Sequence, residues 1–331
     1  MRHCVLTFAL VLCAAGSSRA DDLTIGGDAR AFAMGGAGIA TSGTADGATR
    51  NNVASLAFDK GNVRVYAPNL GVRAQGAVRQ QRGLDYLFGL GSLGQAAKLV
   101  RDYQGRDSTF AVNASAGVRV GHLEILTNAV GTGTTKANGS NTDVTVDGVY
   151  NFPSIGFASV VPGQKGRFQL AVGGRVKYAN VVHSRLVVDS SGNATPAAEM
   201  NGRETDTRQG IAGDLGLMLK EKDGGPLSLG LAITNAIKPK APVGGATFLT
   251  TASLGAGYVR KNVTLAADLV DLTQAVGKTQ LRAGAEVKAG PLPIRAGYSS
   301  KTGVTYGTRL FGVDLAFSRK QPLEIGSSIR F

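Results

Sequence analysis

The sequence predicts an all-β fold, an antiparallel transmembrane β-barrel of about 14 strands, with an N-terminal plug segment and one short helix between early strands. Three observations predict it. Long stretches alternate apolar and polar residues with period two. Glycine accounts for 47 of the 331 residues without the triplet repeat of collagen. No apolar run reaches the roughly 18 residues of a membrane-spanning helix, which excludes a helical membrane protein.

The alternation is clearest between Gln280 and Phe331. Apolar residues occupy one phase, and glycine, serine, threonine and charged residues occupy the other. Short turns at Gly290-Pro291 and Thr302-Gly303 separate the strands. The same alternation of apolar and polar residues continues upstream. Counting the alternating segments gives roughly 12 to 14 strands near membrane-spanning length.

Two architectures bury such strands. A soluble sandwich packs its apolar faces inward, whereas a transmembrane barrel turns them toward lipid and keeps polar residues in the lumen. The mixture of small, polar and charged residues on the second phase favours the barrel, as does the terminal aromatic residue Phe331. The sequence has no tryptophan, so an interfacial aromatic belt has to come from its 8 tyrosines and 12 phenylalanines.

The N-terminus predicts export. Arg2 precedes an apolar run from Val5 to Ala15, and Ser18-Arg19-Ala20 offers the small residues of a signal-peptide cleavage site. Residues 1–20 are therefore predicted to be a signal peptide. Both cysteines, Cys4 and Cys13, lie within it, so the exported chain has no disulfide and no thiolate nucleophile.

The rest of the chain divides into two parts. Residues 21–60 are rich in glycine and alanine without clean alternation, which indicates an N-terminal plug or cap. Residues 61–331 form the predicted transmembrane barrel. Within them, 83–103 has the spacing of a short, broken amphipathic helix. The strand after Arg167 continues to Asp189, and residues 189–207 are predicted to form a polar outer loop.

No arrangement of residues predicts an enzyme, a cofactor or a metal site. Gly277-Lys278-Thr279 resembles the end of a phosphate-binding loop, but Leu272 occupies the position of the required glycine. His122 and His183 are too far apart in sequence to indicate clustered metal ligands. The net charge of +13 is spread along the chain, which argues against nucleic-acid binding and suits outer-membrane lipid and lipopolysaccharide phosphates instead.

Charged residues on the polar phase of the strands are the candidate lumen residues. Charges in a narrow interior are costly unless they pair, so we expect pairing with each other or with the plug. Glu286 and Asp314 are the acids within cross-strand reach of Arg295 and Arg309. An ion-pair ladder that stiffens the wall and a polar anchor for a ligand headgroup are both compatible with this pattern. The candidates are Arg175, Lys177, Arg282, Glu286, Arg295, Arg309, Asp314 and Arg330.

The opening of the exported chain resembles a known group. The stretch Asp28–Ala40, followed by Asn52–Ala57, is similar to the start of the FadL-like outer-membrane barrels, although Val53 stands where that group has proline. The group includes FadL/TodX hydrophobic-compound transporters, PorV-type secretion barrels and TraF-like plasmid-transfer barrels. The resemblance implies a 14-stranded barrel with a lumenal N-terminal segment. Its motif residues here are Arg30, Met34, Gly35, Gly36, Gly38 and Asn52.

Three functions follow as alternatives. The first is a passive bacterial outer-membrane channel for small hydrophobic compounds, and the second is a non-transport barrel that serves as a platform for secretion or conjugation proteins. The third is a structural barrel with a sealed lumen. In each case Phe331 is the expected signal for the outer-membrane insertion machinery, because the last strand resembles the terminal strand which that machinery recognises.

Overall fold

The computed structural model describes residues 29–41, 52–59, 63–75, 108–138, 141–188, 194–196, 205–240, 248–275, 277–290, 292–311, 313–318 and 324–327. It contains a short α-helix, α3 (Ala29–Ala33), and a 3-10 helix, η1 (Val53–Phe58). No helix in the described residues is long and apolar enough to cross a membrane.

All other regular structure in the described residues is β-strand. The strands are β1 (Val63–Gln75), β2 (Ser108–Val120), β3 (Leu123–Asn138), β4 (Asn141–Val160), β5 (Phe168–Val188), β6 (Ala194–Pro196), β7 (Thr205–Glu221), β8 (Leu227–Ile237), β9 (Thr251–Arg260), β10 (Val263–Val270), β11 (Gln280–Ala289), β12 (Leu292–Ser299), β13 (Gly303–Leu310), β14 (Val313–Ser318) and β15 (Glu324–Ser327).

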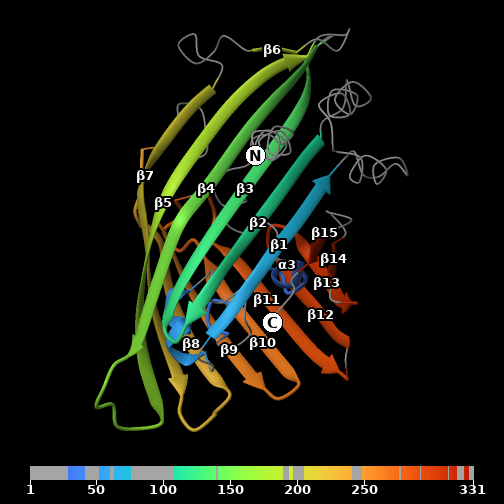
Figure 1. Cartoon of the computed structure of the whole chain (residues 1–331). Helices are drawn as coiled ribbons and strands as arrows, with labels where there is room; N and C mark the ends of the chain where they lie inside the picture. The colour runs from blue at the N-terminus through green and yellow to red at the C-terminus, as the bar shows by residue number, and fades with distance from the viewer. Residues whose placement is uncertain are drawn as a thin grey trace.

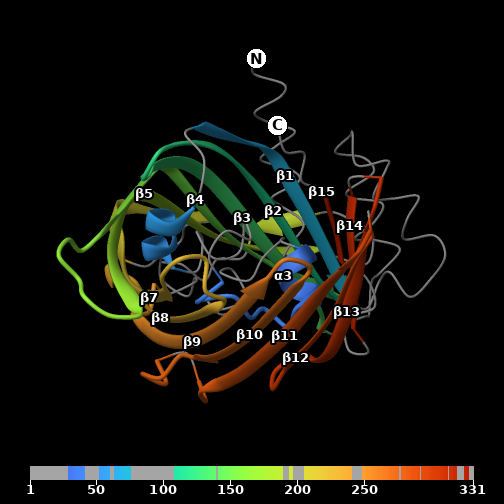
Figure 2. The ribbon, with the colours of Figure 1, turned by 90° about the horizontal axis from the view of Figure 1, so that it is seen from below.

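The strands form one sheet whose pairings follow a circuit. Apart from β6, consecutive strands pair antiparallel, with β5 pairing with β7, and β1 pairs with both β2 and β15. The circuit includes every one of the 15 strands except β6, which adds to β5. Figure 2 shows these strands as a ring around the two short helices. The pairings return from β15 to β1 through Leu70–Arg73, as a barrel requires of strands that span lipid.

The two faces of the ring have opposite chemistry. In β10, Leu265 and Leu269 are exposed on the outside, whereas Thr264 and Asp268, each one residue before them, are buried. The same pattern, with apolar residues exposed and polar residues buried, recurs along β8, β9, β11, β12 and β13. A soluble sandwich would have the reverse arrangement. The transmembrane barrel predicted from the alternation is therefore confirmed.

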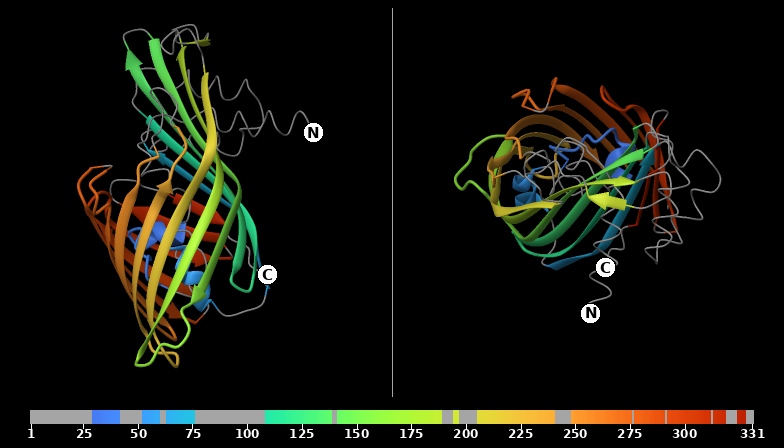
Figure 3. Two further views of the ribbon diagram at one scale, coloured as in Figure 1. Left: turned by 90° about the vertical axis from the view of Figure 1, so that its left-hand side faces the viewer. Right: turned by 90° about the horizontal axis from the view of Figure 1, so that it is seen from above.

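The strands on the two sides of the ring differ in length. Strands β8 to β13 have 8 to 11 residues, close to the roughly 9 to 11 that a tilted membrane strand needs. Strands β1 to β5 and β7 have 13 to 21 residues and extend well beyond the short ones (Figures 1 and 3). The expectation that strands cluster near spanning length is wrong for this half. The polar loop predicted at 189–207 is also too long, because β7 begins at Thr205.

Several sequence predictions fall outside the described residues. These are the signal peptide at 1–20, the helical segment predicted at 83–103, and the terminal residues Arg330 and Phe331. Of the segment predicted as a plug, residues 29–41 and 52–59 are described.

An arginine scan of two equally exposed leucines tests the assignment of the outer face. Leu265 lies in the middle of β10 and is 46% exposed, whereas Leu272 follows the strand and is 42% exposed. Leu265→Arg should lower the free energy of unfolding in phospholipid vesicles by about 2–4 kcal/mol, and Leu272→Arg by about 0–1 kcal/mol. Equal costs in a urea titration would contradict the membrane position of β10.

Candidate functional site

The candidate site is the contact between the interior of the ring and an N-terminal stretch, here called the inner segment (residues 29–41 and 52–59). Figures 2 and 3 show α3 and η1 inside the ring. After α3 the backbone turns at Gly35 and Gly36, whose φ angles of 68° and 78° lie in the left-handed region that favours glycine. All but two of its residues, Ala31 and Asp59, are buried. The segment is therefore enclosed by the strands.

Glycines on the polar phase of the strands allow the inner segment to approach the wall. A Cβ atom added at Gly297 would lie 2.2 Å from the backbone nitrogen of Gly35, and one at Gly173 would lie 2.8 Å from that of Ala54. Gly216, Gly230, Gly257 and Gly284 meet backbone or side-chain atoms of the inner segment in the same way. Any larger residue at these positions would have to displace backbone, so the contact requires glycine.

Wall side chains bind the backbone of the first half of the inner segment. The Asp268 carboxylate of β10 accepts hydrogen bonds from the amides of Gly38 (2.6 Å) and Ile39 (3.1 Å). The Thr305 hydroxyl of β13 accepts from the amide of Gly35 and donates to the carbonyl of Ala33, both at 3.1 Å. These bonds satisfy buried backbone groups that form no strand pairing, and each would be costly to leave unmade.

Asn52 links the two halves of the inner segment to the wall. Its side-chain amide donates to the carbonyls of Ile39 (3.2 Å) and Leu217 of β7 (3.0 Å). Its side-chain oxygen accepts from the amide of Ala54 at 3.1 Å and so caps η1. Asn52 is 1% exposed. The residue therefore positions η1, the chain at Ile39 and β7 relative to one another.

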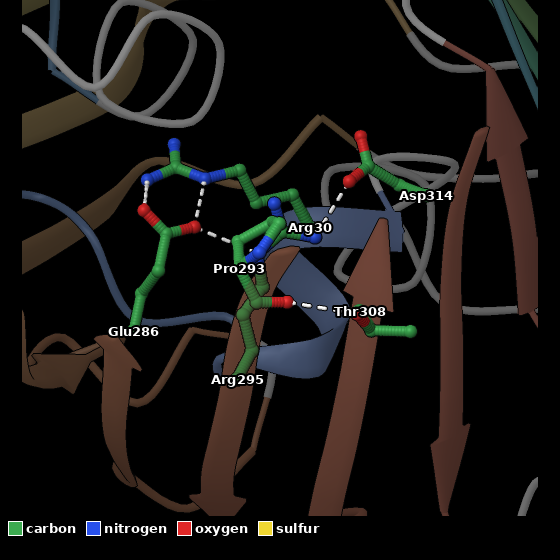
Figure 4. A network of polar contacts seen from close by, with 6 residues as sticks. All are labelled: Arg30, Glu286, Pro293, Arg295, Thr308 and Asp314. Atoms are coloured by element: carbon green, nitrogen blue, oxygen red, sulfur yellow. Dashed lines mark hydrogen bonds and ion pairs between the residues drawn. The ribbon is translucent and has the colours of Figure 1, made fainter. Parts of the chain in front are cut away.

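A buried group of charges attaches α3 to three wall strands. Glu286 of β11 binds Arg30 of α3 at 2.8 Å and Arg295 of β12 at 2.7 Å. Arg295 also binds Asp314 of β14 at 2.5 Å. Figure 4 shows Glu286 facing both guanidinium groups. Each charged side chain here is at least 89% buried and has an oppositely charged partner, which offsets much of the cost of removing it from water.

A second group of charges lies on β3, β5 and β7. Arg175 of β5 binds Glu124 of β3 at 2.8 Å, and Lys177 of β5 binds Asp214 of β7 at 2.8 Å. At the end of η1, Asp59 pairs with the fully buried Arg119 of β2 at 2.8 Å. Charge pairs therefore connect the inner segment to the wall at both of its ends.

The remaining sequence-predicted residues take these positions. Met34 packs with Ala37 and Ala266 in a small buried cluster. Gly36 lies against the side chain of Arg282, which itself donates to Gln280 at 2.9 Å. Arg309 is paired in register with Asp314.

Several site residues were not singled out from the sequence. Asp268, Glu124 and Asp214 each face the interior and bind either the inner segment or a predicted cation. Asp268 stands on the polar phase of an alternating strand, and this signal could have identified it. The pairing of Arg30 with Glu286 joins residues 256 apart in sequence, which no local pattern shows.

The described residues contain no group of three or more histidine, cysteine or acidic side chains placed to hold a metal ion. The arrangement binds backbone amides, carbonyls and cations of the inner segment, so its evident chemistry is attachment of that segment inside the ring.

Two glycines provide a matched test of the backbone contact. Gly297 faces the inner segment, whereas a Cβ at Gly174 would meet nothing within 4 Å. Gly297→Ala should lower the free energy of unfolding by about 1–3 kcal/mol because of overpacking, and Gly174→Ala should leave it unchanged or raise it slightly. Thermal unfolding of both variants in one detergent checks this, and equal stability would contradict the contact.

Two arginines provide the corresponding test for the buried charges. Arg295→Met leaves Asp314 and one side of Glu286 without this cation, so we expect a loss of about 3–5 kcal/mol. Arg167→Met removes a pair with Glu221 in which the arginine is 67% exposed, and we expect a loss of at most about 1 kcal/mol. Urea unfolding in vesicles measures both, and a small effect of Arg295→Met would show that the charge group contributes little.

The similarity of this chain to known proteins is found in its three-dimensional structure and not in its sequence. No protein-family model and no curated protein matches the sequence. A deltaS2S3 mutant of TodX, a monoaromatic hydrocarbon channel, matches with a TM-score of 0.55 at 16% identity, covering 91% of this chain and 96% of that one.

Two further channels match over similar lengths. CymD, a monoaromatic hydrocarbon channel, has a TM-score of 0.51 at 13% identity and 93% and 97% coverage of this chain and that one. TbuX, a toluene transporter of Ralstonia pickettii, has a TM-score of 0.51 at 13% identity and 91% and 96% coverage. The chain therefore has the fold of the FadL/TodX-like outer-membrane β-barrels.

Proposed function

We propose that this chain is a passive channel for small hydrophobic compounds in the bacterial outer membrane, reached by export through a signal peptide at residues 1–20. The three proteins of the same fold are named as channels or transporters of monoaromatic hydrocarbons. Their names suggest the substrate class, and the geometry of the interior supports a passage that the inner segment controls.

The observation that carries the proposal is how the inner segment is attached. The ring of strand pairings is complete without it. Its contacts with the wall involve side chains, such as Asp268, Thr305 and Glu286 of the wall and Asn52 of the segment, which donates to the Leu217 carbonyl. The segment can therefore be displaced without breaking any pairing of the wall, which is what a plug of a passive channel requires.

The inner segment also brings apolar surface into a charged interior. Val53, Leu56 and Phe58 pack with Met218 of β7 in one cluster, and Phe32 packs with Ala316 of β14 in another. A small apolar molecule that entered the ring as the segment moved away from the wall would meet these side chains. Burial of its apolar area against them would supply binding without a directional contact.

Uptake of radiolabelled toluene tests the proposed function. Cells whose own hydrocarbon channels have been deleted should take up toluene faster when they express this chain, and the rate should not saturate sharply because transport is passive. A hydrophilic sugar of similar size should show a much smaller gain. Uptake of toluene no faster than in cells carrying an empty vector would refute the channel.

A reversible cross-link tests the part played by the inner segment. Ala33 of α3 and Ala316 of β14 share one buried cluster, and residues 21–331 contain no cysteine. The double variant Ala33→Cys/Ala316→Cys should lose toluene uptake when oxidised and regain it on reduction, because the disulfide fixes α3 to the wall. The single variant Ala316→Cys is the control and should ignore the reductant. Uptake by the oxidised double variant at the wild-type rate would mean that α3 does not move during transport.

A further inference from the structure

A phenylalanine from a connecting segment lies inside the ring. Phe248 belongs to the connection between β8 and β9, and its side chain is 9% exposed. It packs in one buried cluster with small and branched side chains of β5 and β7, namely Ala179, Val181 and Ala212. Those three residues are fully buried, whereas Tyr178 and Ile211, which precede two of them, are exposed on the outer face. The Phe248 cluster therefore lies on the inner face of the wall.

The start of the same connection also turns inward. A Cβ atom added at Gly210 of β7 would lie 2.9 Å from the Cβ atom of Pro239. Gly210 and Ala212 stand on the same phase of β7, so Pro239 lies against the inner face too. Both described ends of the connection thus lean over the interior, at the end of the ring where β5 and β7 extend beyond β8 (Figure 1).

A bulge in β8 precedes this connection. Between the pairs Leu215–Ile233 and Gly213–Ile237, β8 uses more residues than β7 does. Asn235 lies within the bulge with a φ angle of 52°, a left-handed value that asparagine adopts more readily than most residues. Because a bulge re-aims side chains, Asn235 faces the connection as well as the wall.

Asn235 attaches the connection to the wall. Its side-chain amide donates to the carbonyl of Leu249 (3.3 Å), and its own carbonyl accepts from the Thr250 hydroxyl (2.8 Å). Its backbone amide donates to Asp214 of β7 at 2.9 Å, and its side-chain oxygen accepts from Lys177 of β5 at 3.2 Å. The backbone beside Phe248 is therefore held, so the aromatic ring moves mainly by rotation of its own side chain.

The Phe248 cluster and the inner segment occupy different levels of the interior. Gly173 of β5 lies against Ala54 of the inner segment. Ala179 follows six residues later on the same strand, a separation of roughly 20 Å. The end with the longer connections faces the cell exterior in bacterial outer-membrane barrels. A compound that enters from there meets Phe248 before it meets the inner segment.

We propose that Phe248 is a specificity-determining residue that limits passage to compounds with one aromatic ring. The proposal rests on the proposed function, since it requires that hydrophobic compounds pass through the ring of strands. The side chain of phenylalanine is a benzyl group, so its ring covers the same area of wall as toluene does. Rotation of that ring away from Ala179 and Ala212 exposes an apolar place of one-ring size, and a compound with two rings needs more room than this rotation releases.

Uptake of toluene and of biphenyl, which has two rings, tests the proposal in cells whose own hydrocarbon channels have been deleted. Wild type should favour toluene. In Phe248→Ala the ratio of biphenyl to toluene uptake should rise roughly ten-fold or more, the discrimination that an apolar pocket achieves by size. Phe248→Trp fills more space and should lower toluene uptake several-fold.

The matched control is Phe311→Ala. Phe311 is a fully exposed phenylalanine in the turn between β13 and β14, at the opposite end of the ring. This variant should keep the wild-type ratio of biphenyl to toluene uptake. Uptake of sucrose should stay low in every variant, which shows that no general leak has opened.

Asn235→Gly tests the attachment of the connection. Glycine keeps the left-handed backbone and removes the side-chain bonds to Leu249 and Lys177. The ratio of biphenyl to toluene uptake should rise, but less than in Phe248→Ala. A folding defect lowers uptake of both compounds, so it cannot produce the expected gain of biphenyl.

An unchanged ratio in Phe248→Ala, or the same increase in Phe311→Ala, would overturn the proposal. So would a gain of sucrose as large as the gain of biphenyl. In each of these cases toluene uptake by wild type still supports the channel itself. Toluene uptake by wild type no faster than in cells with an empty vector would instead refute the proposed function, and the role of Phe248 with it.

Discussion

The packing of one backbone against another inside the ring determines much of this structure. The inner segment reaches the wall so closely that side chains are excluded at the points of contact, and the polar phase of the strands supplies glycine there, as at Gly173, Gly284 and Gly297. The high glycine content of the chain therefore has a local cause. Without these glycines the inner segment would have to move toward the centre, and its bonds to Asp268 and Thr305 would lengthen.

Charge inside the ring follows from the same enclosure. An interior that holds peptide backbone needs donors and acceptors, and charged groups that leave water need partners. Asp268 meets the first need by accepting from the amides of Gly38 and Ile39, and Glu286 meets the second, because it binds a cation from the inner segment and another from the wall. At the other end of the segment, Asp59 pairs with Arg119 of the wall. The inner segment is held by a few side-chain contacts and takes no part in the backbone pairing of the strands. This combination permits movement of the segment in an intact barrel.

The sequence predicted the faces of the strands better than it predicted their lengths or partners. Period-two alternation is local, so it assigned Arg295 and Glu286 to the interior and Leu265 to the exterior. Strand length depends on pairing with neighbours, and β2 to β5 and β7 support one another far beyond the membrane. The partners of Arg175 lie on β3 and β7, where only the register of the folded sheet brings Glu124 and Asp214 to it.

Amide hydrogen exchange of the inner segment tests the central claim most directly. The amides of Gly35, Gly38 and Ile39 donate to buried wall side chains. In the folded protein in detergent they should exchange as slowly as amides of β10 and β11, roughly a hundred-fold or more below an exposed turn amide such as that of Lys165. Exchange of these three amides at the rate of the turn would contradict an inner segment bound to the wall.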